Sequence, residues 1–347
     1  MRLRRQAPPV VAVTGAASGL GRLLVERLAA RDDLAGLIGL DTTAARVDGV
    51  VWRAVEVRDP LLASRLSGVT TVVHLATTYD VTTDPDARRA QNVRGTELLL
   101  AAARTAGVKR VVLTTSAAVY GPRPGDPVPL PEDAPLLALP DDSLVGAHVE
   151  VERLAAVRGG PEVTVLRPAT LVGGRLGQEY DGTLLRQLSS SRLLAVRGTE
   201  PLWQLCHVDD LVSALELAAC GVVTGGVTVG CDGWLAQSDV ESIAGVRRLE
   251  LPASVAISTA ERLHRLGVSA GSPRELDHLL APLVVPSTAL KAVGWEPQWT
   301  NDTALRGHLA GRAAEGRGGA YTAAGATVAL VGTAALVRAA RRRRRGH

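Results

Sequence analysis

Residues 10–30 read VVAVTGAASGLGRLLVERLAA, and this stretch decides the fold. Its β-branched run predicts a buried strand ending at Thr14, the glycine-rich segment that follows predicts a tight turn, and LLVERL predicts a helix. Such a unit points the free N–H groups and the positive dipole end of the helix at a phosphate. Gly15 permits the turn, while Gly19 and Gly21 allow close approach because they lack Cβ. The stretch therefore predicts a dinucleotide-binding turn.

An acidic residue follows this turn at the distance expected for ribose recognition. Asp41 closes the apolar run LIGL, about twenty residues beyond the glycines. A carboxylate at that place accepts hydrogen bonds from the hydroxyl groups of an adenosine ribose and repels a 2′-phosphate. We therefore expect the cofactor to be NAD rather than NADP.

Composition places the chain among globular proteins. With 347 residues, 46% hydrophobic and 21% charged, it is long enough for one large α/β domain and a smaller appendage. The net charge of +4 comes from nine arginines within 2–5 and 338–345, because the rest carries 30 basic and 35 acidic residues. This mildly acidic body argues against nucleic acid as a partner. Cys206, Cys220 and Cys231 lack CxxC spacing, which indicates a reducing, cytoplasmic setting without a zinc site.

Strand and helix patterns alternate along the first half of the chain. Strands are predicted at 50–57, 68–78 and 110–115, and helices at 60–66 and 86–106. Strands that alternate with helices at this spacing need crossover connections, which favour a doubly wound parallel sheet with its ligand at the carboxyl ends of the strands. The expected fold class is α/β, with a Rossmann-type sheet.

Seven segments share the order and wording of known signatures: VTGAASGLG (13–21), HLATT (74–78), NVRGTELLLAAA (92–103), VVLTTSAAVYG (111–121), VTVLRPATLVGG (163–174), CHVDDLVSALELA (206–218) and VGWEPQW (293–299). Together they resemble the extended short-chain dehydrogenase/reductase family, in its branch of NAD-dependent sugar epimerases and dehydratases. The resemblance covers about residues 9–310. It implies an NAD-binding Rossmann domain (9–167) and a mixed segment that completes the sheet and forms a C-terminal substrate subdomain (168–312). Composition adds an Ala/Gly-rich and Arg-rich, basic C-terminal tail (313–347).

The resemblance also implies the parts of an NAD site. The glycine turn would hold the phosphates, Asp41 the adenosine ribose, and Asn92 would brace the middle of the sheet. The cofactor-binding residues implied are Gly15, Ser18, Gly19, Leu20, Gly21, Asp41, Glu56, Val57, Leu75, Ala76, Thr77, Asn92 and Pro168. The glycine spacing departs from that of the extended branch and follows the single-domain branch instead.

The larger departure concerns catalysis. The family uses a Tyr that transfers a proton, a Lys four residues later, and a Ser or Thr that orients the substrate oxygen. Ser116, four residues before Tyr120, matches that hydroxyl. The segment VEVERL (149–154) resembles the one that follows the family's Lys. This places Leu144 at the Tyr position and His148 at the Lys position.

No shift of register restores the usual pair, because no Tyr and Lys in the chain have the needed spacing. The tyrosines are Tyr79, Tyr120, Tyr180 and Tyr321, and the lysines are Lys109 and Lys291. The candidate catalytic residues are therefore Ser116 and His148. His148 either serves as a substitute acid–base group that titrates near neutrality or lies on a helix surface without a role. Ser116 either orients substrate or only satisfies backbone groups.

Two functions stay open at this point. The first is an NAD-binding oxidoreductase or epimerase that acts on a nucleotide sugar or a similar hydroxyl or carbonyl compound with a degenerate catalytic site. The second is a non-catalytic, NAD-binding regulatory or structural protein. Arg175, Arg186 and Arg197 are available for a substrate phosphate or carboxylate. Thr170 stands where many sugar-nucleotide enzymes of the family carry Asn, which leaves a steroid-type substrate open.

Three further expectations concern metals, membranes and assembly. The CHVDD segment (206–210) predicts a helix N-cap with acidic residues in the first turn rather than a metal site. Residues 318–337 are uncharged and as a helix would be about 30 Å long, but four glycines weaken that helix. We favour a flexible basic tail, or one that lies on a surface and is attracted to anionic lipid, over a spanning helix. Helices at 86–106 and 144–157 are the expected homodimer contacts.

Overall fold

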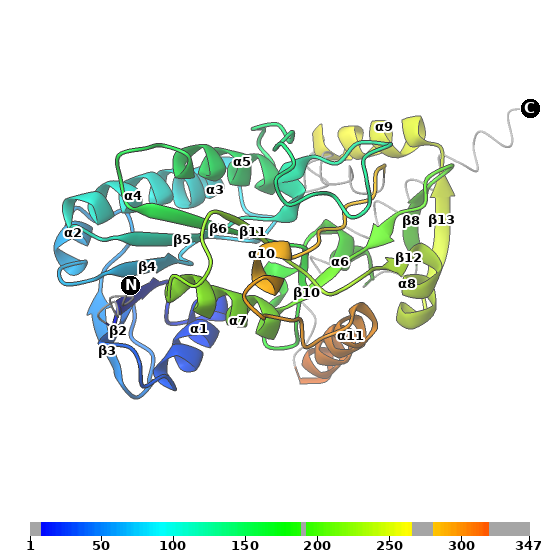
Figure 1. Ribbon diagram of the computed structural model, residues 1–347. Coiled ribbons are helices and arrows are strands. Elements are labelled where there is room, and N and C mark those ends of the chain that lie inside the picture. The colour runs from blue at the N-terminus through cyan, green and yellow to red at the C-terminus, as the bar shows by residue number, and fades with distance from the viewer. Residues whose placement is uncertain (1–7, 189–191, 266–279, 319–347) are drawn as a thin grey trace, which may run out of the picture.

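The computed structural model describes residues 8–188, 192–265 and 280–318. Its centre is a seven-stranded parallel sheet with the order β11-β6-β5-β4-β1-β2-β3 (Figure 1). The strands are β1 (Val10–Thr14), β2 (Gly36–Asp41), β3 (Val50–Ala54), β4 (Thr71–His74), β5 (Arg110–Thr114), β6 (Glu162–Pro168) and β11 (Gly226–Val229). The strand order reverses between β1 and β4, and such a point leaves a ligand crevice at the carboxyl ends. The predicted doubly wound α/β sheet is confirmed.

Helices cover both faces of this sheet (Figure 1). On one face lie α1 (Gly19–Ala29) and α7 (Val208–Ala219), and on the other lie α2 (Leu62–Arg65), α4 (Gly95–Thr105) and α5 (Leu144–Ala155). Val11 and Val13 of β1 pack in the core under α1, whereas Ala12 packs in the core on the opposite face. Because both faces are buried, these strands are continuous apolar runs, and this made them recognisable in the sequence.

Several element boundaries differ from the predicted ones. The strands predicted at 50–57 and 68–78 end earlier, because the chain leaves the sheet after Ala54 and His74. Val55 and Leu75, in the loops that follow these strands, are nevertheless buried. Their apolar side chains therefore do not indicate that the strands continue. The helix predicted at 86–106 has three parts: α3 (Pro85–Arg88), a π-helical turn (Arg89–Arg94) and α4. Helix α1 begins at Gly19, inside the predicted turn.

After Pro168 the chain builds a smaller part at the right of Figure 1. Three strand pairs form it: β7 (Thr170–Val172) with β10 (Leu205–His207), β9 (Leu202–Trp203) with β12 (Leu235–Ala236), and β8 (Arg192–Val196) with β13 (Arg247–Leu251). Its helices are α6 (Thr183–Leu188), α8 (Gln237–Ala244), α9 (Ala253–Arg265) and α11 (Asn301–Gly318), while α10 (Thr288–Lys291) packs near β11. Trp203 and Leu205 are buried in its core. The domain boundaries at 167 and 312 stay predictions, and α11 runs past the second.

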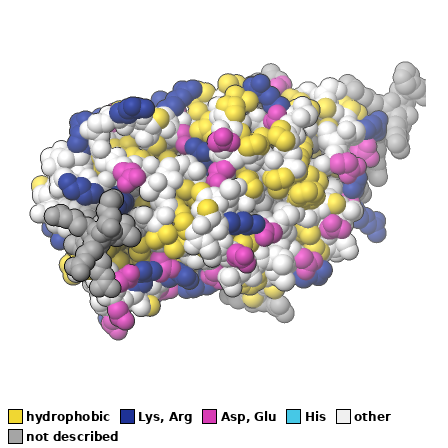
Figure 2. All heavy atoms as spheres, in the orientation of Figure 1, with side chains coloured by type: hydrophobic (Ala, Val, Ile, Leu, Met, Phe, Trp, Pro, Cys, Tyr) yellow, Lys and Arg dark blue, Asp and Glu magenta, His cyan; other side chains and the backbone are white. Residues whose placement is uncertain are grey.

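The surface face in Figure 2 intersperses Lys and Arg with Asp and Glu side chains, without one continuous patch of a single sign. Within the described ranges, no helix is long and apolar enough to cross a membrane. Residues 319–347 lie outside those ranges, so the membrane-surface role of the tail stays a prediction. The expected homodimer also stays a prediction.

Candidate functional site

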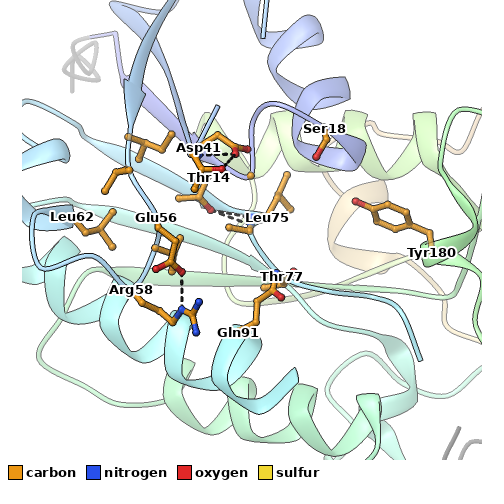
Figure 3. A pocket seen from close by; sticks show the side chains of 16 residues that line it. Thr14, Ser18, Asp41, Glu56, Arg58, Leu62, Leu75, Thr77, Gln91 and Tyr180 are labelled. Carbon is orange, nitrogen blue, oxygen red and sulfur yellow. Dashed lines mark hydrogen bonds and ion pairs between the residues drawn. The ribbon is translucent and has the colours of Figure 1, made fainter. Parts of the chain in front are cut away.

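A pocket of about 350 Å³ opens at the carboxyl ends of β1, β2 and β4 (Figure 3). Eight of the predicted cofactor residues line it: Gly15, Ser18, Asp41, Glu56, Val57, Leu75, Ala76 and Thr77. Gly19, Leu20 and Gly21 form the first turn of α1 beside it. We call this space the cofactor pocket. The structure therefore brings residues from four separate sequence segments to one place.

Side-chain hydrogen bonds fix the floor of the cofactor pocket. The Thr14 hydroxyl oxygen accepts hydrogen bonds from the backbone N–H groups of Leu75 (3.1 Å) and Ala76 (3.2 Å), which ties the ends of β1 and β4 together. Asp41 accepts from the N–H of Ala17 in the glycine turn (3.0 Å) and from the N–H of Thr42 (2.7 Å). The Asp41 carboxylate is thus held at the pocket wall by two backbone donors.

The glycines of the turn fit a cofactor cradle. Gly15 has a φ of +66°, and a Cβ there would lie 2.8 Å from the carbonyl oxygen of Leu75. A Cβ at Gly21 would overlap the carbonyl of Gly15, so α1 starts this close to the turn only with glycine. Ser18, the N-cap of α1, makes no capping hydrogen bond with its side chain, which leaves the hydroxyl for a ligand. These features are those a pyrophosphate needs.

Tyr180 enters the cofactor pocket from the side opposite Glu56 (Figure 3). Its hydroxyl accepts a hydrogen bond from the backbone N–H of Leu20 (3.1 Å), in the first turn of α1. Burial raises the pKa of this hydroxyl. A phosphate that uses the Leu20 N–H must therefore displace Tyr180. The sequence analysis missed this residue, although it is one of only four tyrosines in the chain.

A second pocket, of about 200 Å³, adjoins the first, because Tyr180 lines both. Its walls come from the end of β5, the start of α5, the β6–β7 connection and β9. Ser116, His148 and Leu144 all line it, and so does Pro168, which does not line the cofactor pocket. We call it the substrate pocket. The structure thus brings both predicted catalytic residues together.

His148 is buried, with 4% of its surface exposed, so its interpretation as a helix-surface residue is wrong. Its Nδ1 has no hydrogen-bond partner among the described residues. Burial, together with the charge of Arg88, lowers the pKa of His148 to about 4. The imidazole is therefore neutral at pH 7, and the expected titration near neutrality is corrected.

Ser116 lies half-buried at the end of β5 and caps a short 3₁₀ turn. Its Oγ accepts a hydrogen bond from the backbone N–H of Ala118 (3.2 Å). The hydroxyl proton remains able to donate. Tyr120, four residues on, lines neither pocket, and its hydroxyl donates to the carbonyl of Glu132 (2.6 Å).

Tyr79 is a second residue that the sequence analysis did not single out for the site, although it directly follows the HLATT segment. Its ring stacks on Tyr180 with centroids 5.2 Å apart and lies 6.1 Å from the His148 ring. Its buried hydroxyl makes no well-formed hydrogen bond among the described residues, although the Thr77 and Thr114 hydroxyls lie near enough to act on its pKa. Burial raises the pKa of Tyr79 well above its usual value. Unpaired buried polar atoms are uncommon in folded interiors, and those of Tyr79 and His148 lie at the substrate pocket.

The remaining polar groups behind the substrate pocket have structural partners or line a small cavity. Asn92 accepts from the N–H of Thr78 (2.8 Å) and donates to its carbonyl (2.9 Å), which fixes the loop after β4. His74 is buried, shares a hydrogen bond with Thr14 through Nδ1 (2.8 Å), and its pKa is lowered to about 4 by burial. Asn92, His74 and His148 border a cavity of about 10 Å³.

The three arginines expected to meet a substrate anion pair with acids instead. Arg175 contacts Glu26 (2.9 Å) and Asp209 (3.9 Å), Arg186 contacts Asp80 (2.9 Å), and Arg197 contacts Glu250 (3.4 Å). None of the three lines the substrate pocket. The structure therefore does not support the expectation that these arginines bind a substrate anion.

The CHVDD segment is a helix start, as expected. His207 is the N-cap of α7, and its Nδ1 accepts from the N–H of Asp209 (3.2 Å). Asp210 accepts from the N–H groups of Gln298 (2.9 Å) and Trp299 (3.3 Å). In the part of the chain that the structure describes, no group of three or more His, Cys, Asp or Glu residues could hold a metal ion.

The chain is similar to several known proteins. An uncharacterized protein of Mycobacterium tuberculosis is 32% identical over 325 residues, which cover 88% of this chain and 85% of the relative. A UDP-glucose 4-epimerase of Mycolicibacterium smegmatis is 27% identical over 82% of this chain and 93% of its own. The structure of the Bordetella bronchiseptica enzyme WbmG in complex with NAD aligns with a TM-score of 0.65 at 20% identity, over 91% of this chain and 97% of that one.

The structural comparison with WbmG shows only that the two folds are alike, because the sequence identity is 20%. A model of the NAD-dependent epimerase/dehydratase family matches residues 11–227, which is more than half of the chain. The match spans the glycine turn, Asp41, Ser116 and His148. The chain therefore belongs to the NAD-dependent epimerase/dehydratase family, whose cofactor is NAD.

Proposed function

We propose that this protein is an NAD-dependent oxidoreductase or epimerase that acts on a hydroxyl or carbonyl group of a small molecule. The observation that carries the proposal is the adjacency of the two pockets. They share Tyr180 as a wall, and Ser116 and His148 lie on the substrate side. A nucleotide sugar is one candidate substrate, because the mycobacterial relative at 27% identity is a UDP-glucose 4-epimerase.

In this proposal the cofactor pocket holds NAD in the orientation that the family uses. The glycine turn and Ser18 would hold the pyrophosphate, Asp41 the adenosine ribose, and Glu56 and Val57 the adenine. The nicotinamide ribose would lie along Leu75, Ala76 and Thr77, toward the substrate pocket. When bound, NAD accepts a hydride from an alcohol carbon or, in its reduced form, returns one to a carbonyl carbon. The fit is supported by the glycine positions and by the Asp41 carboxylate already held at the pocket wall.

Ser116 would orient the oxygen of the substrate. Its Oγ already accepts the N–H of Ala118, so its own proton is left to donate to a carbonyl or hydroxyl oxygen. His148 would contribute a neutral ring nitrogen near that oxygen. Because the pKa of His148 lies near 4, the ring is neutral at pH 7, with one nitrogen that donates and one that accepts, and it gains a proton poorly at that pH.

Leu144 occupies the family's proton-donor position with a side chain that carries no proton to transfer. General acid–base catalysis contributes about 10²- to 10⁴-fold, so we expect turnover to be slower than in relatives with the usual Tyr and Lys by a factor of that order. Substrate binding does not need that group, and the hydroxyl proton can pass to water instead. Slow but specific turnover is therefore the expected behaviour.

The test is to incubate the purified protein with NAD and a panel of nucleotide sugars and hydroxysteroids, and to follow NADH absorbance and epimerised product. Ser116→Ala and His148→Ala should abolish the turnover, whereas Ser64→Ala, on the exposed side of α2, should leave it unchanged. The paired change Leu144→Tyr and His148→Lys should raise it. Turnover that survives Ser116→Ala would contradict the assigned role.

A non-catalytic NAD-binding protein is the second candidate. It is favoured by Leu144 in the substrate pocket and by Tyr180, which engages the N–H of Leu20 that a phosphate would use. NAD binding without turnover across the panel, and without gain from the change Leu144→Tyr with His148→Lys, would support it over the enzyme.

A further inference from the structure

The walls of the substrate pocket are largely apolar. Its lining includes Leu144 and Val145 of α5, Leu171 of β7, and Leu202 and Trp203 of β9. Among the residues described around this pocket, its lining includes no lysine, arginine, aspartate or glutamate. A ligand that fills the space therefore meets mainly hydrocarbon.

The polar groups of Trp203 and Gln204, in the wall formed by β9 and the residue that follows it, make hydrogen bonds within the protein. Gln204 donates to the carbonyls of Cys231 (2.8 Å) and Val285 (2.8 Å), and its Oε1 accepts from the N–H of Val285 (2.8 Å). The indole N–H of Trp203 donates to Gln237 (2.8 Å). These two side chains therefore present their apolar surfaces to the pocket. At the end formed by α5 and the loop after β4, the buried Tyr79 hydroxyl and His148 Nδ1 make no well-formed hydrogen bond among the described residues.

Cations near the pocket are also engaged, although not all of them by acids. Arg88, whose charge acts on His148, donates to the backbone carbonyls of Asp142 (2.7 Å), Val81 (3.1 Å) and Thr83 (2.6 Å) and does not line the pocket. Arg186 donates to Asp80 and to the backbone carbonyls of Asp181 and Gln178, and Arg175 and Arg197 pair with Glu26 and Glu250: all are ties within the protein. A diphosphate buried here would bring two negative charges into apolar surroundings without a cation from the described lining. Burying a charge without a partner is strongly unfavourable.

We propose that the substrate is a neutral, largely apolar alcohol or ketone rather than a nucleoside diphosphate sugar. Its oxygen lies at Ser116, and its hydrocarbon body lies along Leu144, Leu171 and Trp203. In the oxidising direction the alcohol loses a hydride from carbon to NAD⁺ and a proton from oxygen to water, which yields the ketone, NADH and H⁺. This inference rests on the proposed function only in that it takes this pocket as the substrate side.

Equilibrium binding tests the inference without turnover. The full-length protein is saturated with NAD⁺, which cannot reduce a ketone, and is titrated by calorimetry with 2-hexanone, 2-octanone, 2-decanone and UDP-glucose. Each added methylene should tighten ketone binding about fourfold, because it leaves water for an apolar wall. UDP-glucose should bind more weakly than 2-decanone. Tighter binding of UDP-glucose, or ketone affinities independent of chain length, would overturn the inference.

Matched leucine variants locate the binding site. Leu171→Gln places an amide in the pocket wall and should weaken 2-decanone binding about tenfold or more, whereas Leu139→Gln, at a side chain that is 57% exposed outside the pocket, should not change it. Thermal unfolding of both variants checks that they are folded, and Leu202→Gln repeats the test on β9. Equal ketone affinity in Leu171→Gln, Leu202→Gln and the parent protein would refute the assignment.

The outcomes separate this inference from the proposed function. Chain-length-dependent ketone binding without turnover of any alcohol would sustain the inference and count against the enzyme. Turnover of a nucleotide sugar, abolished by Ser116→Ala, would sustain the enzyme and overturn the inference.

Discussion

Replacing Tyr180 by phenylalanine is expected to tighten NAD binding. The Tyr180 hydroxyl accepts the backbone N–H of Leu20, which lies in the first turn of α1. A pyrophosphate at this helix start needs the same kind of donor, so NAD must displace the hydroxyl. Tyr180→Phe removes the competing hydroxyl but keeps a ring that can stack on Tyr79.

The magnitude follows from the one hydrogen bond that NAD must break. A neutral hydrogen bond contributes about 0.5–1.5 kcal/mol net. If NAD no longer has to break it, the Kd for NAD falls by about 2- to 12-fold, with about fivefold for a bond of 1 kcal/mol. Ring displacement contributes equally to both proteins and therefore cancels in the comparison.

Titration calorimetry with NAD on the parent protein and on Tyr180→Phe measures this change. Tyr120→Phe is the matched control, because the Tyr120 hydroxyl bonds Glu132 and Arg167 and lines neither pocket. The control should keep the parent Kd. If Tyr180→Phe bound NAD with equal or weaker affinity, the hydroxyl would not compete with the cofactor, and the reasoning would be refuted.

Three other predictions concern cofactor choice, stability and pH. Asp41→Asn should narrow the preference for NAD over NADP by on the order of tenfold in calorimetry, because it removes a negative charge that repels a 2′-phosphate. Arg167→Met should lower the free energy of unfolding in urea by about 3–5 kcal/mol, since it leaves the buried carboxylate of Glu152 without its partner (2.8 Å), and adding Glu152→Gln should recover part of the loss. Burial lowers the pKa of His74 and His148 to about 4, below the usual value of 6.5, so the native state binds fewer protons than the unfolded state. The stability that these two histidines contribute should be complete above pH 6.5 and be lost as the pH falls toward 4. His148→Leu should therefore reduce the change of Tm with pH between 6.5 and 4. If the variant and the parent protein showed the same change of Tm with pH, His148 would not be buried in its neutral form.

The sequence by itself determined the features that depend on neighbours along the chain. Gly15, Gly19 and Gly21 follow an apolar strand directly, and a turn of this kind is set by local backbone freedom and by the absence of Cβ. Asp41 could be placed in the cofactor pocket because it ends the next parallel strand, whose carboxyl end lies at the same edge. The alternation of strands and helices restricted the topology in the same way.

The tertiary structure decided which side chains meet and which are neutralised. Tyr180 lies 160 residues from its hydrogen-bond donor Leu20, and no local pattern encodes that contact. The sequence allowed His148 to be an acid–base group that titrates near neutrality, but burial in the fold lowers its pKa. That burial depends on packing against distant segments. The sequence predicted that Arg186 is available for a ligand, whereas in the fold it pairs with Asp80, which lies 106 residues earlier in the chain. Desolvation and charge pairing arise only when distant segments come together, so they are properties of the folded chain.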